Sequence, residues 1–138
     1  MINIKWDEKY SVGHARIDHE HQVFVDLIIN VSRAEDRCSS KDRVMRLLIE
    51  LRKYAEFHFY SEENIMLDHD FPEYEMHRQE HIRLLCELDR RFHDYRLDAA
   101  TLNELVDFLF QWFALHTTCS DKRLAHHIAS TGEHTPSS

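Results

Sequence analysis

Histidine is the residue type that first suggests chemistry in this sequence, because it occurs twelve times in 138 residues. Some of these histidines, together with acidic residues, stand where the apolar stripe of an amphipathic helix should continue. These polar residues are His21, His58, Glu62, His77, His81 and His116, and Asp121 follows the last of them by five positions. Burying so many polar groups without partners would cost several kcal/mol. The pattern therefore requires a compensating group.

Metal ions are the partners that this set of side chains predicts. Neutral imidazole and carboxylate are good ligands for first-row transition metals, and seven protein ligands are too many for one ion. Two ions bridged by the carboxylates of Glu62 and Asp121 would use every group. The excess of imidazole and the lack of thiolate in the set disfavour structural zinc, calcium and magnesium. Iron and manganese both remain open on this argument.

Four amphipathic segments must carry these ligands, since apolar residues recur along them at three- and four-residue steps. The chain has only two glycines and two prolines, which favours long helices. We expect helices over residues 19–37 with Asp18 as N-cap, from Ser40 to about Asp68, from about Pro72 to about 97, and from Thr101 to about His127. The short connections predict an all-α, up-down-up-down antiparallel four-helix bundle with an N-terminal arm. Residues 1–128 would form this domain, and 129–138 a polar, disordered tail.

The rise of an α-helix tests whether the ligands meet in such a bundle. His58 and Glu62 lie roughly 10 to 16 Å before the second connection, and His77 and His81 lie roughly 12 to 18 Å after it. The same estimate brings the ligands of the first and fourth helices to the same level. All four helices therefore deliver polar groups to one layer, near the end of the bundle where the amino terminus enters.

Asp121 departs from helical spacing, because five residues after His116 it would point about 140° away on a straight helix. A π-bulge adds one residue to a helical turn and would bring the two side chains into line. We therefore predict a helical distortion near Thr117–Ser120.

At these ligand positions the sequence resembles the hemerythrin family, in particular its single-domain members. The likeness rests on His21 within IDHEH, on the runs HFYSEE, HRQEH and HTTCSD, and on Trp6 and Gly13 ahead of them. It covers roughly residues 4–127. Seven ligands in the same order make it a highly specific signal.

The resemblance implies a di-iron centre joined by an oxo or hydroxo bridge and by two carboxylates. Carried over position by position, one iron would be held by His77, His81 and His116, the other by His21 and His58, and both by Glu62 and Asp121. The iron with two histidines keeps an open position, where the family binds dioxygen reversibly. This implies a role in dioxygen storage, delivery or sensing rather than an enzyme.

Apolar neighbours of the ligands should wall the dioxygen pocket and exclude water. We expect Phe24, Phe59 and Trp112 to line it, together with Thr117. In the family an apolar residue commonly follows the last ligand histidine, so Thr117 is a departure. Our hypothesis is that its smaller, polar side chain admits water and speeds autoxidation.

Other functions remain as alternatives to dioxygen binding. A di-iron peroxidase or oxidase, a nitric oxide reductase and an iron-handling protein would use the same ligands. The sequence offers no general acid or base beyond the metal ligands, which favours binding over catalysis. Glu63 and Glu80 lie beside ligands in the sequence but off the apolar stripes, so we expect them on solvated faces.

The charge and hydropathy of the sequence restrict the classes of partner that the protein is expected to bind. The net charge of -8 disfavours binding to nucleic acid, and no apolar stretch is long enough to span a membrane. No signal peptide is visible at Met1–Tyr10, which predicts a cytoplasmic protein. The expected partners are dioxygen and either an oxygen-using enzyme or a signalling domain.

Overall fold

Long helices make up nearly all of the computed structural model, which describes residues 10–36, 40–116 and 120–130. Its elements are α1 (Ala15–Asp36), α2 (Lys41–Asp68), α3 (Tyr74–Arg96), α4 (Leu102–His116) and α5 (Lys122–Ser130). The described residues contain no strand. This confirms the predicted all-α class.

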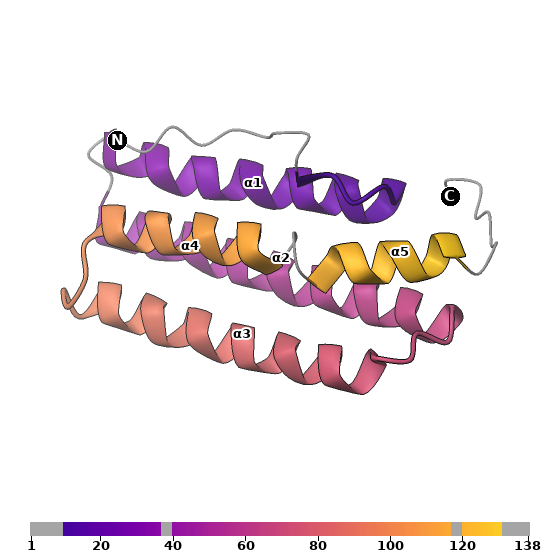
Figure 1. Ribbon diagram of the computed structural model, residues 1–138. Coiled ribbons are helices and arrows are strands. Elements are labelled where there is room, and N and C mark those ends of the chain that lie inside the picture. The colour runs from indigo at the N-terminus through magenta and orange to yellow at the C-terminus, as the bar shows by residue number, and fades with distance from the viewer. Residues whose placement is uncertain (1–9, 37–39, 117–119, 131–138) are drawn as a thin grey trace.

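The helices form an antiparallel bundle with a closed, four-cornered cross-section. α1 packs against α2 and α4, and α3 packs against the same two helices. Figure 1 shows α1 to α4 side by side along their lengths, with α5 continuing beyond the end of α4. The fourth corner of the bundle is therefore made of two helices in succession, where the sequence predicted one.

Local capping explains where two of the helices begin. Ser40 caps α2, and its hydroxyl accepts a hydrogen bond from the backbone N–H of Arg43 at 3.2 Å. Thr101 and Glu104 form the predicted capping box before α4, with reciprocal bonds of 3.0 and 3.1 Å. These side chains satisfy backbone donors that would otherwise lack a partner at a helix start.

Two predicted helix starts were wrong by a few residues. α1 begins at Ala15, because the ring Nδ1 of His14 accepts from the Ile17 N–H at 3.3 Å and so caps the helix. Asp18 is no N-cap; it lies in the first turn, where its carboxylate accepts from the backbone of Val12 and Gly13 at 2.7 and 3.2 Å. It thereby fastens the arm to α1.

The third helix begins after Pro72 rather than at it. Phe71 is 5% exposed, and its N–H donates to the carbonyl of Met66 at 2.9 Å. This contact closes the turn between α2 and α3, so Pro72 still belongs to the turn and α3 starts at Tyr74. At the other end of the chain α5 runs to Ser130, two residues into the segment expected to be a tail. Residues 131–138 lie outside the described residues.

The apolar core is divided into two clusters. The larger fills most of the bundle and includes Phe24, Leu51, Leu88 and Leu109. The smaller lies at the end where α1 and α3 begin, and consists of Ile17, Ile65, Met66, Phe71, Leu124 and Ile128. Along the chain, the predicted ligands of each corner of the bundle fall between a member of one cluster and a member of the other. A buried polar layer therefore separates them.

Within residues 10–36, 40–116 and 120–130, no helix combines the length and the apolar character needed to cross a bilayer.

The larger cluster should carry most of the bundle's stability. Leu88 has no exposed surface, and replacing a buried leucine by alanine typically costs about 2 to 5 kcal/mol because a cavity remains. We expect Leu88→Ala to lower the free energy of unfolding by that amount in urea denaturation. The same substitution at Leu67, which is 55% exposed on α2, should leave it nearly unchanged. Equal losses in both variants would contradict the assignment of the core.

Candidate metal centre

The seven predicted ligands all lie in the polar layer and come from all four corners of the bundle. α1 contributes one, α2 and α3 two each, α4 one, and the segment between α4 and α5 one; these are His21, His58, Glu62, His77, His81, His116 and Asp121. Each of the seven is at most 5% exposed. The structure thus brings together, out of water, every side chain that the sequence singled out.

The ligand atoms form two groups that share Glu62. One group joins Glu62 with His77, His81 and His116; the other joins Glu62 with His21, His58 and Asp121. In each group, one nitrogen or oxygen atom per residue lies within 4.8 Å of the others. Each group is therefore compact enough to surround one cation.

The carboxylate of Glu62 faces both groups at once. Its Oε1 atom lies 3.0 Å from Nε2 of His81 and 3.6 Å from Nε2 of His116. Its Oε2 atom lies 3.3 Å from Nε2 of His58. One oxygen thus points toward each group, which is the arrangement that a bridging carboxylate requires.

Asp121 divides its oxygens in the same way. Oδ1 lies 3.0 Å from Nε2 of His116, and Oδ2 lies 2.8 Å from Nε2 of His21. Ser120 and Asp121 have π-helical backbone hydrogen bonding, so the predicted distortion is confirmed at these residues. Residues 117–119, including Thr117, lie outside the described residues.

Many polar side-chain atoms of this cluster have no hydrogen-bond partner among the described residues. Both oxygens of Glu62 and of Asp121 are buried without a correctly oriented donor in the described part of the chain. The same holds for Nε2 of three ligand histidines, His77, His81 and His116. Each buried unsatisfied group costs about 1 to 3 kcal/mol. Lone pairs that converge in this way suit cations, so the donor set fits a pair of metal ions.

The pKa values of the cluster show the same demand for positive charge. Burial opposes the protonated form of His116, but the negative charge of Asp121 and the nearby carboxylates of Glu62 and Glu80 hold its pKa well above the ordinary value. Burial likewise opposes ionisation of Asp121, yet His116 and the other rings hold its pKa well below the usual range. Protons on the imidazoles therefore balance the carboxylates when metal is absent, and metal binding would displace them.

Comparison with known proteins decides the family. The profile described as "Hemerythrin HHE cation binding domain" matches residues 12–128. The chain belongs to the hemerythrin family. A bacteriohemerythrin of Ralstonia nicotianae is 33% identical over 137 residues, covering 96% of this chain and 93% of the relative. A bacteriohemerythrin of Clostridium acetobutylicum is 26% identical over 123 residues, covering 85% of this chain and 95% of the relative.

Three further carboxylates in this hemerythrin-family chain contact the outer nitrogens of ligand histidines. Glu20 Oε1 lies 2.7 Å from Nδ1 of His58, and Glu63 Oε2 lies 2.9 Å from Nδ1 of His81. Glu80 Oε1 lies 3.7 Å from Nδ1 of His116, an ion-pair distance. The expectation that Glu63 and Glu80 lie on solvated faces was therefore wrong, and Glu20 was missed.

The environments of Glu20 and Glu80 lower the pKa values of their carboxyl groups. Although burial opposes ionisation of Glu20, bonds to His58 and Ser61 hold its pKa below the ordinary value. The His116 ring lowers the pKa of Glu80 to about 2, with a smaller contribution from the Ser120 hydroxyl, which donates to Glu80 at 3.1 Å. A sequence signal for all three exists, since each stands directly beside a ligand in the chain.

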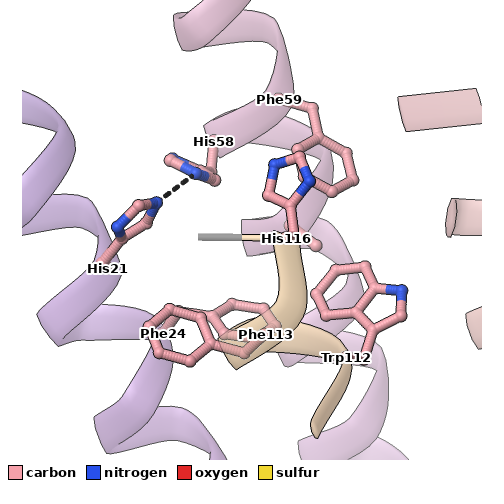
Figure 2. Close-up of a pocket in the computed structure, with 8 residues that line it drawn as sticks. His21, Phe24, His58, Phe59, Trp112, Phe113 and His116 are labelled. Atoms are coloured by element: carbon pink, nitrogen blue, oxygen red, sulfur yellow. Dashed lines mark hydrogen bonds between the residues drawn. The ribbon is translucent and has the colours of Figure 1, made fainter. Parts of the chain in front are cut away.

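A small cavity opens beside the cluster. It has a volume of about 10 Å³ and is lined by His21, Phe24, Ala55, His58, Phe59, Trp112, Phe113 and His116. Figure 2 shows the phenyl rings of Phe24 and Phe113 facing the imidazoles of His21 and His58. The predicted residues Phe24, Phe59 and Trp112 are present, whereas Phe113 was missed. Roughly 10 to 15 Å³ is the space that one water molecule needs.

Metal content tests the centre directly. We expect the metal-free chain to bind two equivalents of ferrous iron or cobalt(II), with a rise in melting temperature because metal binds the folded state alone. Replacing both His77 and His116 by alanine removes two donors from one group and should abolish at least one equivalent. The exposed His126, replaced by alanine, is the control. Saturation below two equivalents in the parent chain, measured by elemental analysis, would contradict the assignment.

Proposed function

We propose that this protein binds dioxygen reversibly at a pair of irons. One iron would be held by His77, His81 and His116, the other by His21 and His58, and both by the bridging Glu62 and Asp121. Iron follows from the imidazole-rich donor set together with membership of the family. Both relatives carry the name bacteriohemerythrin. The bound iron pair would supply the electrons that dioxygen binding requires.

The observation that carries the proposal is the division of oxygens within the two shared carboxylates. Oε1 of Glu62 and Oδ1 of Asp121 face His116 at 3.6 and 3.0 Å. Oε2 of Glu62 faces His58, and Oδ2 of Asp121 faces His21, at 3.3 and 2.8 Å. A single ion would not require the two oxygens of each carboxylate to face different ligand groups, whereas two ions bridged by these carboxylates would.

The unequal share of histidines leaves room for a ligand on one side. His21 and His58 belong to the group with two imidazoles, and both line the cavity of about 10 Å³. A diatomic molecule is of the right size for such a space, whereas most organic substrates are too large. The side chains of this chain would thus hold one coordination position free and point it into an apolar pocket.

The pocket wall favours binding over turnover. Apart from the ligand histidines, the lining residues among residues 10–36, 40–116 and 120–130 are all apolar or aromatic, including Phe24, Phe59 and Phe113. The rings of Phe24 and Phe113 stack with centroids 5.8 Å apart. Such a wall excludes water and hinders charged species from leaving. It offers no acid or base that would promote reaction of a second substrate.

An optical spectrum provides the test. We expect the iron-loaded, reduced protein to develop a charge-transfer band in air and to lose it when dioxygen is removed, over repeated cycles. The measurement is absorbance under alternating air and argon. Irreversible oxidation accompanied by turnover of peroxide would instead indicate an enzyme and reject the proposal.

The apolar wall should also set the lifetime of the dioxygen complex. Phe24 is 3% exposed, and Phe24→Leu would shrink the wall while keeping the position apolar, at a smaller cost in stability than the roughly 3 to 5 kcal/mol of a buried Phe→Ala change. We expect faster autoxidation, followed as decay of the charge-transfer band. Phe57→Leu, at a position 52% exposed on α2, is the matched control and should decay like the parent. Equal decay in the two variants would refute the role of the wall.

A further inference from the structure

The three outer carboxylates follow one pattern around the bundle. Each stands next to a ligand on its own helix: Glu20 precedes His21, Glu63 follows Glu62, and Glu80 precedes His81. Each reaches a ligand histidine on the next helix in the chain, so that α1 contacts α2, α2 contacts α3, and α3 contacts α4. We call Glu20, Glu63 and Glu80 the outer ring.

The outer ring always meets the same atom of the imidazole. The contacts of His58, His81 and His116 with the ring are all made through Nδ1, while Nε2 of each faces Glu62 or Asp121. Nδ1 of His116 lies at an ion-pair distance of 3.7 Å from Glu80 and makes no hydrogen bond to it. In the hydrogen-bonded pairs of His58 and His81, Nδ1 carries the proton, because an ionised carboxylate only accepts hydrogen bonds. The lone pair of the neutral ring is then on Nε2, where a metal ion can use it.

Glu20 and Glu80 of the outer ring also contact side chains other than the imidazoles. The hydroxyl of Ser61 donates to Glu20 at 2.9 Å, and the guanidinium of Arg16 lies 3.3 Å from the same oxygen. The hydroxyl of Ser120 donates to Glu80 at 3.1 Å. Since Ser120 directly precedes Asp121, Glu80 ties α3 to the π-helical turn that carries a bridging ligand.

The charge of the ring is distributed unevenly over the two ligand groups. Glu63 and Glu80 both contact histidines of the group with three imidazoles, whereas Glu20 alone contacts the group with two. The Arg16 guanidinium also offsets part of the Glu20 charge. Negative charge behind a ligand raises its basicity and stabilises a more highly charged ion.

We propose that Glu20, Glu63 and Glu80 are positioning residues that hold the Nε2 atoms toward the metal pair and favour its oxidised, ferric state. The proposal rests on the proposed function, because it takes the metal pair as given. Within the three-histidine group, Glu63 makes a direct hydrogen bond of 2.9 Å, whereas Glu80 lies 3.7 Å from its histidine, so Glu63 should have the larger effect on this group.

The test compares Glu63→Gln, Glu63→Ala and Glu50→Gln. Glutamine keeps the accepting oxygen but removes the charge, alanine removes both, and Glu50 is an exposed residue elsewhere on α2. Affinity for cobalt(II) and ferrous iron is measured anaerobically by titration. The midpoint potential of the iron-loaded protein is measured by spectroelectrochemistry.

We expect metal affinity to fall about 10- to 100-fold in Glu63→Ala, by less in Glu63→Gln, and not at all in Glu50→Gln. The midpoint potential should move to more positive values in Glu63→Gln, a change that a purely structural defect would not cause. A Glu63→Gln variant with the affinity and potential of Glu50→Gln overturns the proposal. So does an equal loss of affinity in both Glu63 variants accompanied by lower melting of the metal-free chain.

This experiment separates the ring from dioxygen binding. Cobalt affinity and the anaerobic midpoint potential are obtained without dioxygen. If the protein oxidises irreversibly in air but the variants show the expected order of metal affinity and midpoint potential, the proposal for the outer ring stands and dioxygen binding is rejected. If the protein binds and releases dioxygen but the variants do not differ, dioxygen binding stands and the proposal for the outer ring is rejected.

Discussion

Two buried carboxylates surrounded by imidazoles are the constraint on which the rest of this structure depends. Glu62 and Asp121 have no exposed surface, and their oxygens lack oriented donors among the described residues. Isolated charges in such a place are tolerated only when paired with opposite charge. The helices must therefore bring cations, or protons on the imidazoles, to one layer of the core. Membership of the hemerythrin family agrees with the former.

Burial of the two apolar clusters offsets the unfavourable free energy of burying this polar layer. Leu51, Leu88 and Leu109 anchor one side and Met66 and Leu124 the other, all fully buried. Burial of apolar surface contributes about 25 cal/mol per Å², and it accumulates on both sides of the polar layer. Apolar packing thus holds the helices together on both sides of the polar layer.

The centre is polarised across the bundle. Its two-histidine side faces an apolar cavity walled by Phe24 and Phe113. Its three-histidine side is backed by Glu63 and Glu80. An apolar wall thus lies on one side, and histidines that contact outer carboxylates lie on the other. This division is consistent with the dioxygen binding proposed above.

Helical periodicity is local, so the sequence by itself determined the all-α class, the seven ligands and the distortion before Asp121. Side chains three or four residues apart lie on the same face of a helix, and this does not depend on how neighbouring helices pack. Only the tertiary structure decided the roles of Glu20, Glu63 and Glu80, which lie beside the stripes and whose partners are on adjacent helices. The packing of helices also decided the cavity and the division of carboxylate oxygens, because both depend on contacts between residues distant in the chain.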